Sequence, residues 1–262
     1  QLRLRRHQRR HPPAARGRSA TASPPPAVSP PPHLAILASS HLGPDGYGND
    51  RTGLRPWPAE IRSALESGNL DTLHWRHLFP TEAQRFARMD WLSRVALLAV
   101  ELLDAQLDLL PLEARDQTGV CLETSSGCLT TDLRFLQSPP RPSLFTYTLP
   151  STAVGEICIR HRLRGPVLCL LSADASGRQA LRETADWVVQ GDAGAALCVR
   201  CEALAADARP CLPDDAFAST AAWFGDALLI GRASGRPRER SVEQGFRALD
   251  VAVAGTPDRG RV

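Results

Sequence analysis

Asp174 lies where the sequence predicts that a strand turns directly into a helix. An apolar run, Val167–Leu171, precedes a turn of small residues, and a helical pattern begins near Ser176 and continues through Val188. Such a turn places one side chain at a helix N-terminus, where backbone N–H groups and the helix dipole favour negative charge. Many enzymes hold a nucleophile in this position. Asp174 is therefore either an aspartyl nucleophile or, the interpretation favoured here, an inert residue suited to a helix start.

Cysteines offer a second possible chemistry. Cys198 and Cys201 form a C-x-x-C pair, but the pair occurs alone on a predicted strand, where residues three apart point to opposite faces. This placement disfavours a zinc or redox site. Cys169 lies inside the apolar strand five residues before Asp174, and a cysteine in such a strand usually serves as a small buried hydrophobe.

Two further groupings of reactive side chains are weaker. His74 and His77 have helical spacing around a tryptophan, but no third ligand lies nearby, so a surface role is favoured over metal binding. Glu123, Ser125 and Ser126 suggest a serine hydrolase, yet the G-x-S-x-G elbow of such enzymes is absent. No metal site and no cofactor site is predicted.

The charge is unevenly distributed. All 31 basic residues are arginine, and seven of them lie in residues 1–18, where there is no acid. The rest of the chain holds 24 arginines against 28 acidic residues, which gives no argument for nucleic-acid binding. No apolar run is long enough to span a membrane. Seven scattered cysteines without an export signal favour reduced thiols and a cytoplasmic location.

The composition divides the chain into three parts. Residues 1–32 are rich in arginine and proline and read as a disordered leader. Residues 33–232 carry the regular apolar patterns, and residues 233–262 form an Arg- and Gly-rich extension. The 262-residue chain is long enough to bury a sizeable core in its middle part.

Strands and helices alternate through the middle part, which predicts an α/β layered sheet with parallel members. The predicted strands are 33–38, 119–124, 167–171, 195–200 and 227–230. The predicted helices are 59–66, 81–109, 127–137, 153–161, the helix after Asp174, and a short one at 242–253. Thr81 is the expected N-cap of the helix 81–109. Ser151 or Thr152 is expected to cap the helix 153–161, with Glu156 completing a partial capping box. Residues 144–150 are expected to be extended.

An ordered set of sequence blocks resembles the N-terminal half of a β-ketoacyl synthase of the thiolase-like superfamily. The blocks are Arg88-Met89-Asp90 with Ser93, Gly119–Thr124, Leu144–Ile157, Arg164-Gly165-Pro166, the Asp174 turn and Gly191-Asp192-Ala193. The resemblance covers about residues 33–232. It is closest to the half-length, chain-length-factor-like proteins of aryl polyene and related pathways. It implies a thiolase-like fold with one N-terminal half-repeat.

The departures from the family pattern bear on activity. The resemblance implies that active relatives carry a nucleophilic cysteine where this chain has Asp174, and two histidines from a second repeat that this chain ends too early to contain. His161, the only histidine near the turn in sequence, lies among arginines and is expected at a surface or interface. We therefore expect a non-catalytic subunit. The alternatives are an independent acyl-ACP condensing enzyme or acyltransferase that uses Asp174, and a fragment without function.

The resemblance also implies a partner. Ketosynthases dimerise through the strand that precedes the turn, and the segment before that strand reaches toward the partner's acyl tunnel. On this chain the interface would be Leu144–Leu171, with Phe145, Tyr147, Thr148 and Leu149 lining the interface or acyl pocket. A single half-repeat would also leave one apolar sheet face uncovered. The expected partner is a full-length ketosynthase, and an acyl carrier protein would be reached through that complex.

Overall fold

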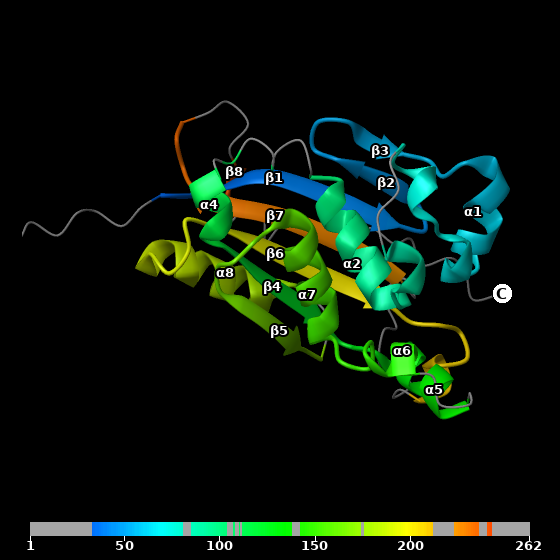
Figure 1. The fold of residues 1–262 in the computed structure, drawn as a ribbon. Helices are drawn as coiled ribbons and strands as arrows, with labels where there is room; N and C mark the ends of the chain where they lie inside the picture. The colour runs from blue at the N-terminus through cyan, green and yellow to red at the C-terminus, as the bar shows by residue number, and fades with distance from the viewer. Residues whose placement is uncertain are drawn as a thin grey trace, which may run out of the picture. The chain divides into compact units, whose positions relative to one another are not determined.

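A mixed eight-stranded sheet lies at the centre of the fold (Figure 1). The computed structural model describes residues 33–80, 85–103, 107, 110, 112–137, 142–173, 176–211, 223–235 and 240–242. The strand order is β3-β2-β1-β7-β6-β4-β5, and β8 pairs with β1. The strands are β1 (Leu34–Gly43), β2 (Gly46–Asn49), β3 (Gly53–Arg55), β4 (Thr118–Thr124), β5 (Val167–Leu171), β6 (Ala195–Ala203), β7 (Trp223–Arg232) and β8 (Arg240–Ser241).

The sheet combines a parallel and an antiparallel part. β4 pairs in parallel with both β5 and β6, whereas β7 pairs antiparallel with β6 and β1. The carboxyl ends of β4, β5 and β6 therefore meet at one end of the sheet, close to α5 and α6 in Figure 1. The predicted α/β class is confirmed, while the expectation of parallel members holds only for these three strands.

Helices cover both faces of the sheet. The α-helices are α1 (Ala59–Glu66), α2 (Trp91–Glu101), α4 (Leu112–Asp116), α5 (Leu129–Gln137), α6 (Pro142–Phe145), α7 (Ser151–His161) and α8 (Arg178–Gln190); short 3-10 turns are η1 (Leu70–Thr72), η2 (Trp75–His77), η3 (Phe86–Arg88) and η4 (Arg209–Cys211). α2 and α7 pack on one face within the larger apolar core, and α8 packs on the other face in a smaller cluster (Figure 1). No described helix combines the length and the apolar content needed to cross a membrane.

The predicted long helix 81–109 begins later than its apolar periodicity suggests. Thr81 lies outside the described residues, and the chain forms the 3-10 turn η3 before α2 starts at Trp91. Asp90 is the N-cap, and its Oδ1 accepts a hydrogen bond from the Ser93 N–H at 3.0 Å. The cap fixes the helix start because it satisfies a backbone donor that would otherwise be unpaired. α2 is buried on nearly all sides, as its composition predicts.

The segment before α7 is not extended, contrary to the sequence-based expectation. Residues 142–145 form α6, and turns follow up to Pro150. The N-cap of α7 is Pro150, which has no side-chain cap, and the Thr152 hydroxyl instead donates to the Thr146 carbonyl at 2.8 Å. Neither predicted cap is present, and Glu156 binds Arg85 and Tyr147 instead of completing a capping box.

β5 is the edge strand of the sheet, and its side chains are the least covered of the parallel strands. Val167 is 58% exposed and Leu171 is 68% exposed. The expectation of an uncovered apolar sheet face is wrong over β4 and β6, because α8 covers them and turns exposed charged residues, such as Arg182 and Glu183, outward. Among the described parallel strands, the exposed large apolar side chains belong to the edge strand β5.

Candidate functional site at the carboxyl ends of the parallel strands

The turn predicted around Asp174, called the elbow below, follows β5 in the chain. The strand ends at Leu171, and α8 begins at Arg178 after the N-cap Gly177, whose φ of +75° is readily adopted only by glycine. Asp174 lies outside the described residues. The predicted strand and the predicted helix are therefore confirmed, and the chemical role of Asp174 stays a prediction.

A buried carboxylate from β4 occupies the start of α8. Glu123 Oε1 accepts hydrogen bonds from the Ser172 hydroxyl at 2.8 Å and from the Gly177 N–H at 3.0 Å. Its Oε2 accepts from the Ala180 N–H at 2.8 Å. Glu123 is fully buried, so these bonds are shielded from water. The backbone donors and positive dipole that could stabilise an anionic nucleophile thus already hold a carboxylate of the chain itself.

A second buried carboxylate organises the loop that follows β4. Glu202, at the end of β6, accepts hydrogen bonds from the backbone N–H and the hydroxyl of both Ser125 and Ser126, and from the Thr124 hydroxyl at 3.1 Å. Burial raises the pKa of the Glu202 carboxyl, although these hydrogen bonds act in the opposite direction. Both serine hydroxyls point to this carboxylate, which disfavours the serine-hydrolase interpretation.

A row of charged side chains crosses the sheet beside the elbow. Asp226 on β7 accepts from Arg200 Nε at 2.6 Å and is 2.7 Å from His41 Nδ1, while His41 Nε2 is 3.0 Å from Asp45. Burial lowers the pKa of His41, but the hydrogen bonds and charges of the two aspartates outweigh burial and raise the pKa to about 10. His41, Arg200 and Asp226 line one side of an open pocket of about 210 Å³.

The cysteines near the elbow are poorly suited to nucleophilic chemistry. Cys169 is partly buried on β5, less than the sequence suggests because β5 is an edge strand, and burial raises its pKa to about 11. Cys198 packs with the α8 cluster, whereas Cys201 packs in the core on the opposite sheet face. The C-x-x-C pair therefore does not bring its two sulfurs together, as the strand periodicity predicts.

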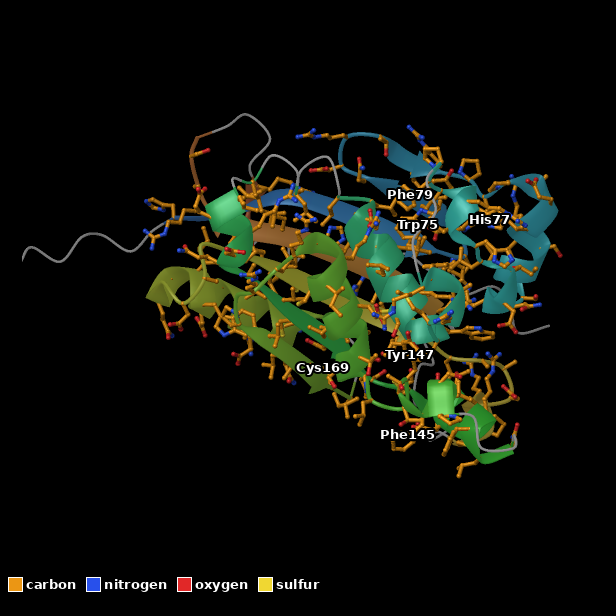
Figure 2. The ribbon with its side chains drawn as sticks, viewed as in Figure 1. Trp75, His77, Phe79, Phe145, Tyr147 and Cys169 are labelled. Atoms are coloured by element: carbon orange, nitrogen blue, oxygen red, sulfur yellow. The ribbon has the colours of Figure 1, made fainter. Side chains whose placement is uncertain are left out.

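The four predicted interface residues lie in α6 and the turns that follow it. Phe145 is 62% exposed at the outer end of the α5–α6 region, and Leu149 is 63% exposed (Figure 2). Tyr147 points inward, and its hydroxyl donates to Glu156 Oε1 at 3.0 Å, the same oxygen that Arg85 Nη2 contacts at 3.0 Å. Thr148 is half-buried. Tyr147 thus anchors the segment to α7, while Phe145 and Leu149 remain available to a partner.

The histidines do not form a site with these residues. His74 and His77 are at least partly exposed around η2, and their backbone and ring atoms contact each other. His161 was expected at a surface or interface, but it is buried within the chain, with Nε2 3.7 Å from Glu101 Oε1. Its neighbours in sequence are arginines, but His161 lies on the side of α7 that faces α2. Across the described ranges, no three or more His, Cys, Asp or Glu side chains are arranged to hold a metal ion.

Sequence reasoning missed Glu123 as a structural carboxylate, together with Glu202 and Asp226. Each lies in an apolar strand that the structure buries on both faces. A buried carboxylate in such a strand needs hydrogen-bond donors. A carboxylate within an apolar strand was therefore the signal that the sequence offered. The donors themselves come from loops that are distant in sequence, so their identity required the fold.

Comparisons with known proteins agree with this architecture. The family model described as β-ketoacyl synthase, N-terminal domain, matches residues 54–210, which is more than half of the chain. No curated protein sequence is similar enough to count as a match.

Solved structures of similar fold include several ketosynthase assemblies. A chain of the ishigamide ketosynthase/chain length factor has a TM-score of 0.53 and 21% identity, covering 79% of this chain and 64% of its own. A chain of the ketosynthase ApeO in complex with its chain length factor ApeC, from Xenorhabdus doucetiae, has a TM-score of 0.53 and 16% identity. The match covers 85% of this chain and 92% of that chain. A chain of AntDE:AntF, an acyl-carrier protein in complex with its ketosynthase, has a TM-score of 0.54 and 15% identity. The match covers 77% of this chain and 62% of that chain.

This chain spans less than two thirds of the length of the ishigamide and AntDE:AntF chains. At identities below 25%, the structural likeness concerns the fold, which is the predicted thiolase-like fold. The family match and the layered sheet with its strand-elbow-helix unit together show that the chain belongs to the β-ketoacyl synthase N-terminal domain family.

Proposed function

We propose that this chain is a non-catalytic, chain-length-factor-like subunit that pairs with a full-length, cysteine-bearing β-ketoacyl-ACP synthase. In this role it would help to set the length of a fatty-acid, polyketide or aryl polyene chain, and it would meet an acyl carrier protein only through the complex. The observation that carries the pairing is the exposed edge strand β5.

An unpaired strand edge readily pairs with another chain unless charge, proline or a covering element blocks it. β5 has the sequence Val-Leu-Cys-Leu-Leu, without any of these protective residues inside the strand. Its two end residues, Val167 and Leu171, expose more than half of their surface. Pairing with a strand of a second thiolase-like chain would bury these side chains and satisfy the free backbone groups of the edge.

The α5–α6 region adds a second apolar contact close to this edge. The rings of Phe135 and Phe145 lie 5.7 Å apart between centroids, and Leu136 and Leu149 are 78% and 63% exposed. Large apolar side chains gathered on one projection usually mark a contact surface. We infer that Phe145, Thr148 and Leu149 contact the partner at or near its acyl tunnel, with Tyr147 holding the segment in place.

Two features support a non-catalytic role. The position of the family's cysteine is taken by Asp174, a poor acceptor for a thioester-borne acyl group. Glu123 also places a negative charge at the start of α8, where an anionic nucleophile would need positive potential. Both features weaken covalent acyl transfer at this elbow.

Co-expression tests the proposal directly. The chain would be produced alone and together with the cysteine-bearing ketosynthase encoded nearest to it. We expect a soluble heterodimer on size-exclusion chromatography, no acylation of the isolated chain by malonyl- or acyl-ACP, and unchanged pathway product with Asp174→Ala. A monodisperse monomer that never associates with the ketosynthase would contradict the pairing. Loss of product with an intact Asp174→Ala complex would contradict the non-catalytic role.

Phe145 provides a test of the acyl-pocket assignment. Phe145→Ala is expected to shift the product toward longer chains, because removing the ring enlarges the space beside the partner's tunnel, and Phe145→Trp is expected to shift it toward shorter ones. Product length would be measured by mass spectrometry of carrier-bound acyl chains. Leu112→Ala, at an exposed leucine of α4 outside the α5–α6 region, is the matched control. An unchanged product distribution in both Phe145 variants would remove Phe145 from the pocket.

A further inference from the structure

The open pocket beside the charged row lies outside the proposed pairing surface. Its volume is about 210 Å³, and β1, β6 and β7 contribute His41, Arg200 and Asp226 to its lining. β2 and β3 contribute further lining residues, among them Leu54. The strand β4 separates β6 from the exposed edge strand β5 (Figure 1). A ligand in this pocket would therefore leave the edge of β5 free.

Arg200 holds a buried hydrogen-bond donor that lacks an acceptor. The side chain is 4% exposed, and its Nε donates to Asp226 Oδ2 at 2.6 Å. Within the described part of the chain, its Nη1 has no hydrogen-bond partner. The guanidinium is also packed against an aromatic ring, with its Cζ 5.1 Å from the centre of the Phe224 ring. Buried charged donors are nearly always satisfied, so we expect an acceptor from a bound molecule.

Ser39 brings a second donor to the pocket. Arg240 Nη2 donates to the Ser39 hydroxyl oxygen at 2.6 Å, so the Ser39 hydroxyl can donate its own hydrogen to a further group. Ser39 lines the pocket, and the contact uses one of the five N–H donors of Arg240. Arg200, Ser39 and Arg240 thus offer donors and positive charge to a ligand that carries acceptor oxygens.

The acids around the pocket do not take up these donors. Both carboxylate oxygens of Asp226 are engaged, Oδ2 by Arg200 and Oδ1 by His41. Glu123, the neighbour of Arg200 on β4, accepts from three neutral donors at the start of α8. Asp50 also lines the pocket, but it is exposed, so water and salt screen its charge. A negatively charged ligand is therefore compatible with the charges of the row.

Apolar side chains form another part of the pocket. Leu54 and Leu228 line it, and Leu54 is 57% exposed although it is a large aliphatic residue. Gly48 also lines it and cannot be replaced by a larger residue, because a Cβ there would lie 2.0 Å from the Gly53 carbonyl oxygen. Since an apolar cavity of about 150 Å³ holds benzene, a pocket of about 210 Å³ has room for about eight non-hydrogen atoms.

We propose that this pocket binds a short-chain aliphatic carboxylate such as hexanoate. The carboxylate accepts hydrogen bonds from Arg200 and Ser39, because a planar guanidinium matches the geometry of a carboxylate. The hydrocarbon chain contacts Leu54 and Leu228. These apolar walls favour a carboxylate over inorganic phosphate, whose remaining oxygens would be left without donors. The site does not depend on the proposed pairing through β5.

Isothermal titration calorimetry of the full chain with sodium hexanoate tests the proposal. Saturable binding is expected, and the affinity should rise about two- to fourfold for each methylene added from butyrate to hexanoate. Hexanamide, which has the same shape without the charge, and inorganic phosphate should each bind at least tenfold more weakly. The proposal is wrong if hexanoate shows no saturable binding at about 10 mM, or if hexanamide or phosphate binds equally well.

Two substitutions locate the ligand. Arg200→Lys keeps the charge but loses the planar guanidinium, and Leu54→Ser removes an exposed apolar wall outside the core. Each is expected to weaken hexanoate binding at least fivefold, with the fold checked by circular dichroism. Leu112→Ser, at an exposed leucine of α4, is the control and should change the affinity less than twofold. If Arg200→Lys does not fold, Leu54→Ser still decides. Equal affinity of wild type and folded Leu54→Ser would place the ligand elsewhere and overturn the proposal.

Discussion

Replacing Glu123 with leucine is expected to lower the free energy of unfolding by about 4 kcal/mol, because three buried donors would lose their acceptor. These donors are the Ser172 hydroxyl and the N–H groups of Gly177 and Ala180. Each unsatisfied buried donor costs about 1–3 kcal/mol, and leucine recovers part of this through apolar burial. Urea unfolding followed by circular dichroism would measure the change.

Glu123→Gln is the matched control for this prediction. The amide keeps the shape of the side chain and one acceptor oxygen but loses the charge at the helix start. It is expected to cost about 1–2 kcal/mol, clearly less than leucine. If Glu123→Leu unfolds within 1 kcal/mol of wild type, the carboxylate does not hold the elbow in solution, and the electrostatic argument against an anionic nucleophile loses its basis.

Asp226→Asn is expected to destabilise the fold by about 3–5 kcal/mol, because it removes the negative charge that Arg200 and His41 share. The Asp226 side chain is 8% exposed and contacts both Arg200 and His41. The asparagine amide retains one acceptor but leaves the Arg200 charge buried without its counterion. Asp45, the other partner of His41, has a side chain that is 62% exposed. Asp45→Asn should therefore cost less than 1 kcal/mol. Equal costs for the two variants would contradict the prediction.

The same charged row predicts how stability depends on pH. The folded pKa of His41, about 10, lies above its unfolded value of about 6.5. The contribution of the charged histidine is therefore complete below pH 6.5, decreases between pH 6.5 and 10, and is absent above pH 10. The free energy of unfolding of wild type should fall more steeply over this window than that of His41→Gln. Parallel curves would show that His41 is not held in its charged form.

Elements with a strong local signal were predictable, and the errors arose where tertiary contacts decided the outcome. The strand-elbow-helix unit and the burial of α2 followed from apolar periodicity alone. The residues from Gly43 to Gly48 look like a loop in sequence, yet Gly46–Asn49 forms β2 because β1 offers a strand to pair with. Residues 144–150 have β-branched and aromatic side chains that suggest a strand, but the Tyr147–Glu156 contact folds them into turns.

The location of the candidate site was predictable from the sequence, but its hydrogen bonds were not. The position of the elbow was evident from one stretch of sequence. Its control by Glu123, which lies on a different strand, depends on the parallel register of β4 and β5, in which Glu123 is paired with Leu170. No local pattern encodes that register, so the occupied helix start could be recognised only in the structure.

The pairing of β1 with β7 also bears on how the chain is made. Leu34 pairs with Arg232 and Leu42 with Gly225, so the partners are roughly 190 residues apart in sequence. At synthesis rates of about 5–20 residues per second, β1 leaves the ribosome about 10–40 s before its central partner exists. During that time β1 can pair with β2 on one edge only, its other edge stays unpaired, and contacts of such high sequence separation form slowly. Folding of this domain during translation must therefore wait for β7, and nascent chains interrupted before Trp223 would expose β1 to aggregation and to chaperones.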